Sequence, residues 1–129
     1  MRTRLTLCAL LLSGTFAAAS PRRTYVVNWG TTHELSAEDR ALIEKCDRQL
    51  RAELLRRGAT VTDRKDARTA IVLRPTLEVL PQGLKLDMVG MRNADKKLLG
   101  SVSVKAGGAS RDAQLRAIVK HVCSEAAEF

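Results

Sequence analysis

Residues 70–106 read AIVLRPTLEVLPQGLKLDMVGMRNADKKLLGSVSVKA, and this stretch decides the fold. Apolar and polar side chains alternate within it, as they do in strands that bury one face of a sheet. Pro81–Gly83 and Asn93–Lys96 have the length and residue types of hairpin turns. The stretch therefore predicts an antiparallel meander with one face in water. Its three strands are expected at residues 70–80, 84–92 and 98–106.

Pro75 departs from the strand pattern of this stretch. Proline has no backbone N–H and cannot donate a hydrogen bond to a neighbouring strand, so we expect an edge or a bulge at this position. If this strand, or the first strand of the domain, has an exposed edge, a partner protein could add a strand to the sheet there.

Two amphipathic helices are expected on either side of the meander. The first begins after Ser36, which with Asp39 forms a candidate capping box, and ends before Gly58. The second begins after Ser110, with Asp112 in its first turn. Apolar residues recur at helical spacing in both segments. They are Leu42, Ile43, Cys46, Leu50 and Leu54 in the first helix, and Leu115, Ile118, Val119, Val122, Ala126 and Phe129 in the second.

The other segments complete a single domain over residues 20–129. Residues 24–29, TYVVNW, are rich in β-branched and aromatic types and predict a first strand, and residues 59–62 predict a short one. Each helix has one apolar face, and the sheet has one solvent-exposed face. This combination predicts a two-layer α+β sandwich. Both helices are expected to pack on one face of a mainly antiparallel sheet, in the order β-α-β-β-β-β-α.

Residues 1–19 have the three-part layout of a secretory signal peptide. Arg2 and Arg4 precede the apolar run 5–12, and three alanines end at Ala19, where we expect cleavage. The apolar run is too short to span a bilayer. Cys8 lies inside that run and does not match a lipoprotein signal. The segment predicts export, to the periplasm first and the extracellular medium second.

The chain is basic, with a formal net charge of +8. Removal of residues 1–19 would remove two arginines and no acid, which lowers the charge to +6. A basic excess favours acidic partners and permits peripheral contact with anionic surfaces such as lipid headgroups. Aromatic residues make up only 3% of the chain and no recognition motif is present, so the sequence predicts no nucleic-acid partner.

Two cysteines remain after residue 19, Cys46 and Cys123. An even number of cysteines in an exported protein is typical of a disulfide. The bridge is geometrically reasonable if the two helices lie side by side, provided that the Cα atoms approach within about 7 Å. The alternative is two separate buried thiols.

The residues that carry catalysis are sparse, and the sequence predicts a protein that is not an enzyme and holds no cofactor or metal. His33 beside Glu34 is the weak candidate for a base or a metal ligand. His121 precedes Cys123 by two residues, which directs the two side chains to different sides of a helix. No zinc spacing, phosphate loop or serine elbow occurs.

Four residues are candidates for contact with a partner protein. Val27 lies in the first predicted strand, and Trp29 ends that strand beside a loop, where an aromatic side chain can anchor a partner. Arg56 and Arg57 form a basic pair at the end of the first helix. A structural role for Trp29 at the rim of the core is the alternative.

The order of elements and several segments resemble a family of bacterial envelope proteins. The segments are Leu54 to Val61, Ala70 to Leu73, and the hairpin from Lys85 to Gly100. They are similar to the small α/β domain of the TolB amino-terminal and CsgG-like group, over roughly residues 24 to 127. The resemblance implies a non-enzymatic adaptor or assembly role in an envelope complex. This chain lacks the lipoprotein cysteine and the additional domain of many such proteins.

The leading hypothesis is therefore a non-catalytic binding or assembly module of the periplasm or cell envelope, which acts through protein-protein contacts with an envelope protein or complex. A small secreted inhibitor or effector is the alternative. An enzyme is third, because the polar residues that catalysis needs do not cluster.

Overall fold

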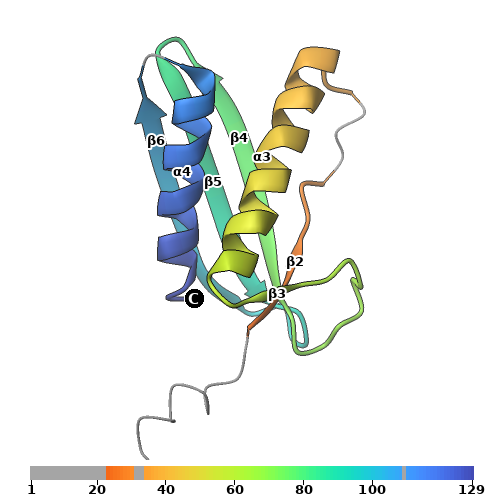
Figure 1. The fold of residues 1–129 in the computed structure, drawn as a ribbon. Helices are drawn as coiled ribbons and strands as arrows, with labels where there is room; N and C mark the ends of the chain where they lie inside the picture. Colours follow the sequence, from red (N-terminus) through yellow and green to blue (C-terminus); the bar gives the residue numbers. More distant parts are fainter. Residues whose placement is uncertain (1–22, 31–33, 109) are drawn as a thin grey trace, which may run out of the picture.

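The computed structural model describes residues 23–30, 34–108 and 110–129. The predicted signal peptide and His33 lie outside these residues. Within them the chain forms the predicted α+β sandwich in the predicted order (Figure 1). The elements are β2 (Thr24–Val27), α3 (Ala37–Arg56), β3 (Thr60–Val61), β4 (Ile71–Leu80), β5 (Gly83–Arg92), β6 (Leu98–Gly107) and α4 (Arg111–Ala126).

The five strands form one sheet in the order β3-β2-β4-β5-β6. β4, β5 and β6 form the predicted antiparallel meander, with Leu80 opposite Gly83 across the first turn. β2 is parallel to both of its neighbours. The parallel pairing follows from α3, which returns the chain to the end of the sheet at which β2 begins (Figure 1).

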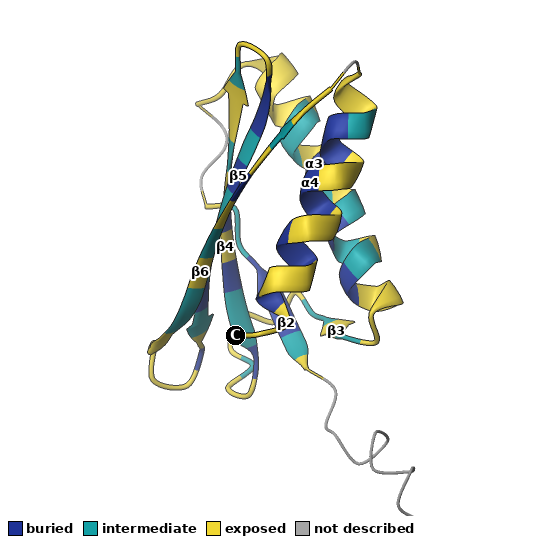
Figure 2. Ribbon diagram, turned by 90° about the vertical axis from the view of Figure 1, so that its left-hand side faces the viewer, coloured by how far each residue is buried: buried dark blue, intermediate teal, exposed yellow. Residues whose placement is uncertain are grey.

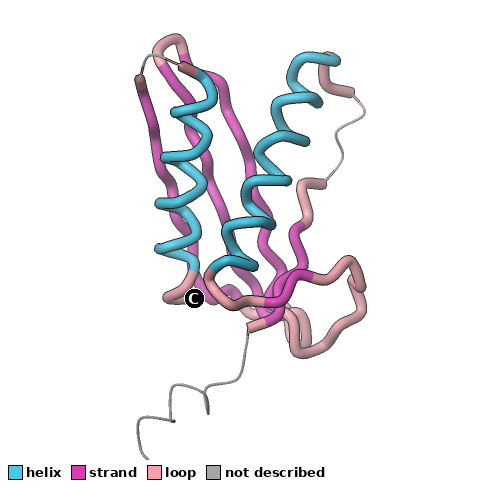
Figure 3. Tube along the Cα trace, viewed as in Figure 1, coloured by secondary structure: helices cyan, strands magenta, loops and turns pink. Residues whose placement is uncertain are grey.

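Both helices cover the same face of the sheet (Figure 2). They lie side by side, with α4 packed over β5 and β6 and α3 beside it (Figure 3). The core lies between the two layers, where burial of apolar side chains supplies most of the stabilisation. Its fully buried members include Leu50, Leu73, Leu84, Leu86, Met88, Leu115, Ile118 and Val122.

The predicted caps set the ends of both helices. The Ser36 hydroxyl accepts a hydrogen bond from the Asp39 backbone N–H, at 3.1 Å, and Ser110 does the same for Ala113. After α3, Gly58 adopts φ +90°, a conformation that other residues rarely adopt, and the chain turns into β3.

The carboxyl-terminal Phe129 packs against two glycines of the sheet. Gly90 of β5 and Gly100 of β6 are register partners. A methyl group on Gly90 would lie 2.3 Å from the Phe129 ring, and one on Gly100 would lie 2.7 Å from it. The pair of glycines therefore gives the ring the space that it occupies, and an alanine at either position would displace it.

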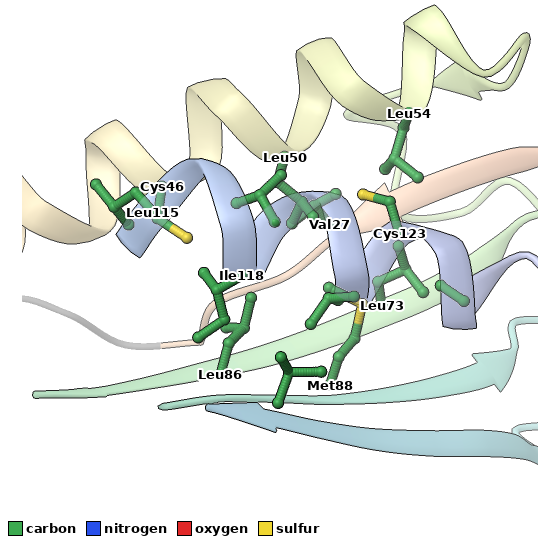
Figure 4. Packing of buried hydrophobic residues seen from close by; sticks show 14 of the residues in the cluster. Val27, Cys46, Leu50, Leu54, Leu73, Leu86, Met88, Leu115, Ile118 and Cys123 are labelled. Carbon is green, nitrogen blue, oxygen red and sulfur yellow. The ribbon is translucent and has the colours of Figure 1, made fainter. Parts of the chain in front are cut away.

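The expected disulfide between Cys46 and Cys123 is wrong, because both thiols are free and buried. α3 and α4 run in the same direction, and Cys46 lies beside Leu115 while Cys123 lies beside Leu54 (Figure 4). Cys46 and Leu54 are two helical turns apart, or about 12 Å. The two cysteines are thus too far apart along the helices for a bridge.

Burial has a chemical consequence for these thiols. It raises the pKa of Cys46 and of Cys123 to about 12, and the negative charges of Asp47 and Glu53 act in the same direction on Cys46 and Cys123 respectively. At neutral pH both are protonated and unreactive, as expected of small buried hydrophobic side chains.

Candidate protein-binding site

β4 has an unpaired half. β2 pairs with β4 only from Ile71 to Leu73, although β4 continues to Leu80. Among the described residues, no strand pairs with the second half of β4 on the side where β2 lies. We call residues 75–80 the open half of β4. Such an edge presents backbone N–H and C=O groups that another strand can bind.

A local turn ends β2 and creates this opening. The Asn28 N–H donates the last hydrogen bond to the Leu73 carbonyl, at 2.8 Å. The Asn28 side-chain oxygen then accepts a hydrogen bond from the Gly30 N–H, and Gly30 has φ +78°. An Asx turn followed by a left-handed glycine directs the chain away from the sheet.

The direction of the β4 backbone explains Pro75. The Leu73 carbonyl faces β2, and strand groups alternate in direction, so the backbone groups of Pro75, Leu77 and Val79 face the open side. Pro75 therefore removes a donor where no strand needs one, and the predicted edge is found in this half of β4. Leu77 and Val79 each keep an N–H and a C=O directed outward.

An apolar hollow lies between the open half and the start of α3. Its volume is about 290 Å³, and apolar side chains from both elements line it. Val79 is 48% exposed and Leu35 is 37% exposed. A second hollow of about 440 Å³ adjoins the first at Asp39, Leu42 and Val79. The apolar lining of the first hollow consists of Leu35, Leu42, Ile43, Leu77 and Val79.

The charge of the first hollow comes from Asp39. Glu78 also lines the hollow, but it alternates with Leu77 and Val79 along β4, so its side chain stands on the other face of the sheet. The second hollow adds the acidic residue Glu38 and two basic residues, Lys45 and Arg111. Lys45 forms an ion pair with Asp112, and Arg111 donates a hydrogen bond to the Gly83 carbonyl. An extended segment that places an apolar side chain in the hollow and a basic side chain beside it would match both features.

The first predicted strand is an internal strand of the sheet. β2 lies between β3 and β4, and the Val27 side chain is only 8% exposed in the core. The Val27 side chain therefore offers a partner little exposed surface, and its role in partner contact stays a prediction. The sequence pattern could not show the internal position of β2, because the position of a strand in a sheet depends on segments far away in the chain.

Trp29 fixes the loop after β2 to α3. Its indole N–H donates to the Asp47 carboxylate at 2.8 Å, and its ring packs against the core. Asp47 also accepts from Arg51, at 2.9 Å. The alternative interpretation of Trp29, as an anchor at the rim of the core, agrees with these contacts. Trp29 therefore fixes the start of the loop that follows β2.

Arg56 and Arg57 lie at another place, beside the seam between the two helices. Both donate to Glu53, at 2.6 and 2.7 Å, and these hydrogen bonds, that of Arg56 above all, lower the pKa of the Glu53 carboxyl. Arg57 also donates to the Lys120 carbonyl. The two arginines thus tie the end of α3 to itself and to α4, away from the open half of β4.

His121 is an exposed residue of α4, apart from the hollows. Across the described part of the chain, no three His, Cys, Asp or Glu side chains are grouped so that they could hold a metal ion. None of the helices formed by these residues is long and apolar enough to cross a membrane.

Comparison with known proteins assigns no family. No known family and no curated protein matches the sequence. The chain is similar to a solved structure from Helicobacter pylori, described as a homolog of neuraminyllactose-binding hemagglutinin. The two share 13% sequence identity over 83% of each chain, with a TM-score of 0.45. A similarity of this size supports no conclusion about function.

Proposed function

We propose that this protein is a non-catalytic binding module that accepts an extended segment of a partner protein along the open half of β4. One observation carries the proposal: Leu77 and Val79 present backbone groups that no other described strand pairs, and these groups lie beside an apolar hollow. Backbone hydrogen bonds would supply affinity, and the hollow would select the side chain that enters it. The Asp39 carboxylate at the hollow favours a segment with a basic residue.

The compartment in this proposal is the cell envelope, with the periplasm as the first location. The signal-peptide layout of residues 1–19 and the resemblance to envelope adaptor domains support it. The partner would be an envelope protein or complex.

Site-specific photocrosslinking in the native cells tests the proposal. A photoreactive residue at Val79 should crosslink one reproducible protein, whereas the same residue at Leu98 should not. Leu98 is a matched control because it is 61% exposed and lies on the opposite edge strand, β6. Equal products from both positions would contradict the assignment. A product recovered only from the culture medium would favour the secreted effector.

A pair of proline variants tests the hydrogen bonds themselves. The Val79 N–H faces the open side, so Val79→Pro should leave the sheet intact and abolish the crosslinked complex, detected in this variant from a photoreactive residue at Leu35. The Glu78 N–H faces β5, so Glu78→Pro should unfold the hairpin, as measured by circular dichroism. If a folded Val79→Pro variant forms the same complex, strand addition at this edge is excluded.

A further inference from the structure

The end of the molecule opposite the open half of β4 is basic. Two loops meet there: residues 62–70, between β3 and β4, and residues 93–97, between β5 and β6 (Figure 1). With the end of β5 they carry six exposed cationic side chains. We call these six residues the basic end: Arg64, Lys65, Arg68, Arg92, Lys96 and Lys97.

A buried asparagine holds the two loops together. Asn93 is 8% exposed, and its side-chain amide donates to the carbonyls of Lys65 and Ala67, at 2.9 and 2.7 Å. Its side-chain oxygen accepts from the Lys96 ammonium, and its backbone N–H donates to the Ala70 carbonyl. The loops are therefore fixed relative to each other before any ligand binds.

The charge of this end is only partly neutralised. Arg64 pairs with Asp66 at 3.6 Å, and Arg92 pairs with Asp95 at 3.2 Å. The other acid of these loops, Asp63, is paired with Arg51 of α3. Among the described residues, four of the six cations of the basic end make no ion pair, and one of these four, Lys96, donates to the neutral Asn93 side-chain oxygen. The other three are Lys65, Arg68 and Lys97.

We propose that the basic end docks on the surface of a bilayer that contains anionic phospholipid. The unpaired cations stand on separate loops, so a plane of many headgroups can engage them together. The chain also enters the described fold at this end, since Arg23 precedes β2 and donates to the Phe129 carbonyl. In this orientation the open half of β4 faces away from the membrane.

Vesicle flotation of the protein without residues 1–19 tests this inference independently of the protein partner. The protein should float with vesicles of roughly 3:1 phosphatidylcholine to phosphatidylglycerol. With vesicles of phosphatidylcholine alone it should stay in the bottom fraction of the gradient. The triple variant Lys65→Gln, Arg68→Gln and Lys97→Gln should lose about 100-fold in partition, because each cation near the surface strengthens binding about fivefold. Salt at about 0.5 M should release the protein.

A second triple variant controls for net charge. Arg48→Gln, Lys105→Gln and Lys120→Gln remove the same charge from exposed positions outside the basic end, and should lower the partition only a few fold. Equal losses in the two variants, or no flotation of the wild-type protein, would overturn the inference. So would soluble polyglutamate that competes as strongly as the vesicles, because that result would assign the basic end to an acidic polypeptide.

Discussion

At Ile71 to Leu73 β4 has a strand on each side, whereas from Pro75 to Leu80 β5 alone pairs with it among the described strands. The first region is closed by β2 and by two loops that a buried asparagine joins, and its surface is basic. The second borders an apolar hollow with acidic residues. One strand thus connects a region that is paired on both sides with a region that is paired on one side, and an unpaired edge is the part of a sheet to which another strand can bind.

The largest expected difference between the two regions lies in side-chain burial. Leu73 is fully buried, so Leu73→Ala should lower the free energy of unfolding by about 3 kcal/mol. Val79 is half exposed, so Val79→Ala should lower it by less than about 1 kcal/mol. Urea denaturation followed by circular dichroism measures both. Equal losses would mean that the open half is packed as tightly as the closed one.

The next effect concerns the junction of the two loops. Asn93→Ala would leave the carbonyls of Lys65 and Ala67 without donors, and should lower the free energy of unfolding by about 2 kcal/mol. Asn28→Ala is the control, because the Asn28 side chain makes one exposed hydrogen bond to Gly30 and should matter less. If Asn28→Ala is the more damaging substitution in urea denaturation, the loops do not depend on Asn93.

A smaller effect is expected where the chain leaves the sheet between the two regions. Asp47→Ala removes the acceptor of the Trp29 indole and should lower the free energy of unfolding by about 1 kcal/mol. Trp29 is the only tryptophan, so its fluorescence should also shift to the red. Asp63→Ala is the matched control for Asp47→Ala, because Asp63 also pairs with Arg51 but does not contact the indole. An unchanged emission maximum in Asp47→Ala would contradict the hydrogen bond between the Trp29 indole and Asp47.

The smallest effect at neutral pH belongs to the two thiols. Their folded pKa of about 12 lies above the ordinary value of 9.0, so the unfolded state loses these protons first as the pH rises. The contribution to stability is complete below pH 9 and is lost between pH 9 and about 12. At pH 8 a thiol reagent should label neither cysteine in the folded protein and both in urea without reductant. If neither cysteine is labelled in urea, the two thiols are not free, and the predicted disulfide is present.

Local patterns were sufficient for most of the fold. Alternation over residues 70–106 predicted the meander, and the caps at Ser36 and Ser110 predicted where the helices begin. These signals succeed because strand alternation and helix caps involve residues close together in the chain. The first predicted strand is shorter than its composition suggested. It ends at Val27 because Asn28 and Gly30 form a turn, a signal that was present in the sequence.

The candidate site was only partly predictable. Pro75 correctly indicated an edge, because a missing donor is tolerated only where no strand needs it. The hollow beside Val79 was missed, since Leu35 and Val79 are far apart in sequence and meet only when α3 packs over the sheet. Trp29, Arg56 and Arg57 were predicted as candidate partner contacts. Each is bound to an acidic residue of α3, and their role in partner contact stays a prediction.

The sequence by itself determined the elements, their order and the two-layer class, since periodicity, capping and turn residues are properties of short segments. The tertiary structure alone decided the position of β2 inside the sheet, the distance between Cys46 and Cys123, and the opening along β4. Each of these depends on the register between segments distant in the chain. That register is set by how the apolar faces pack together, which no local pattern specifies.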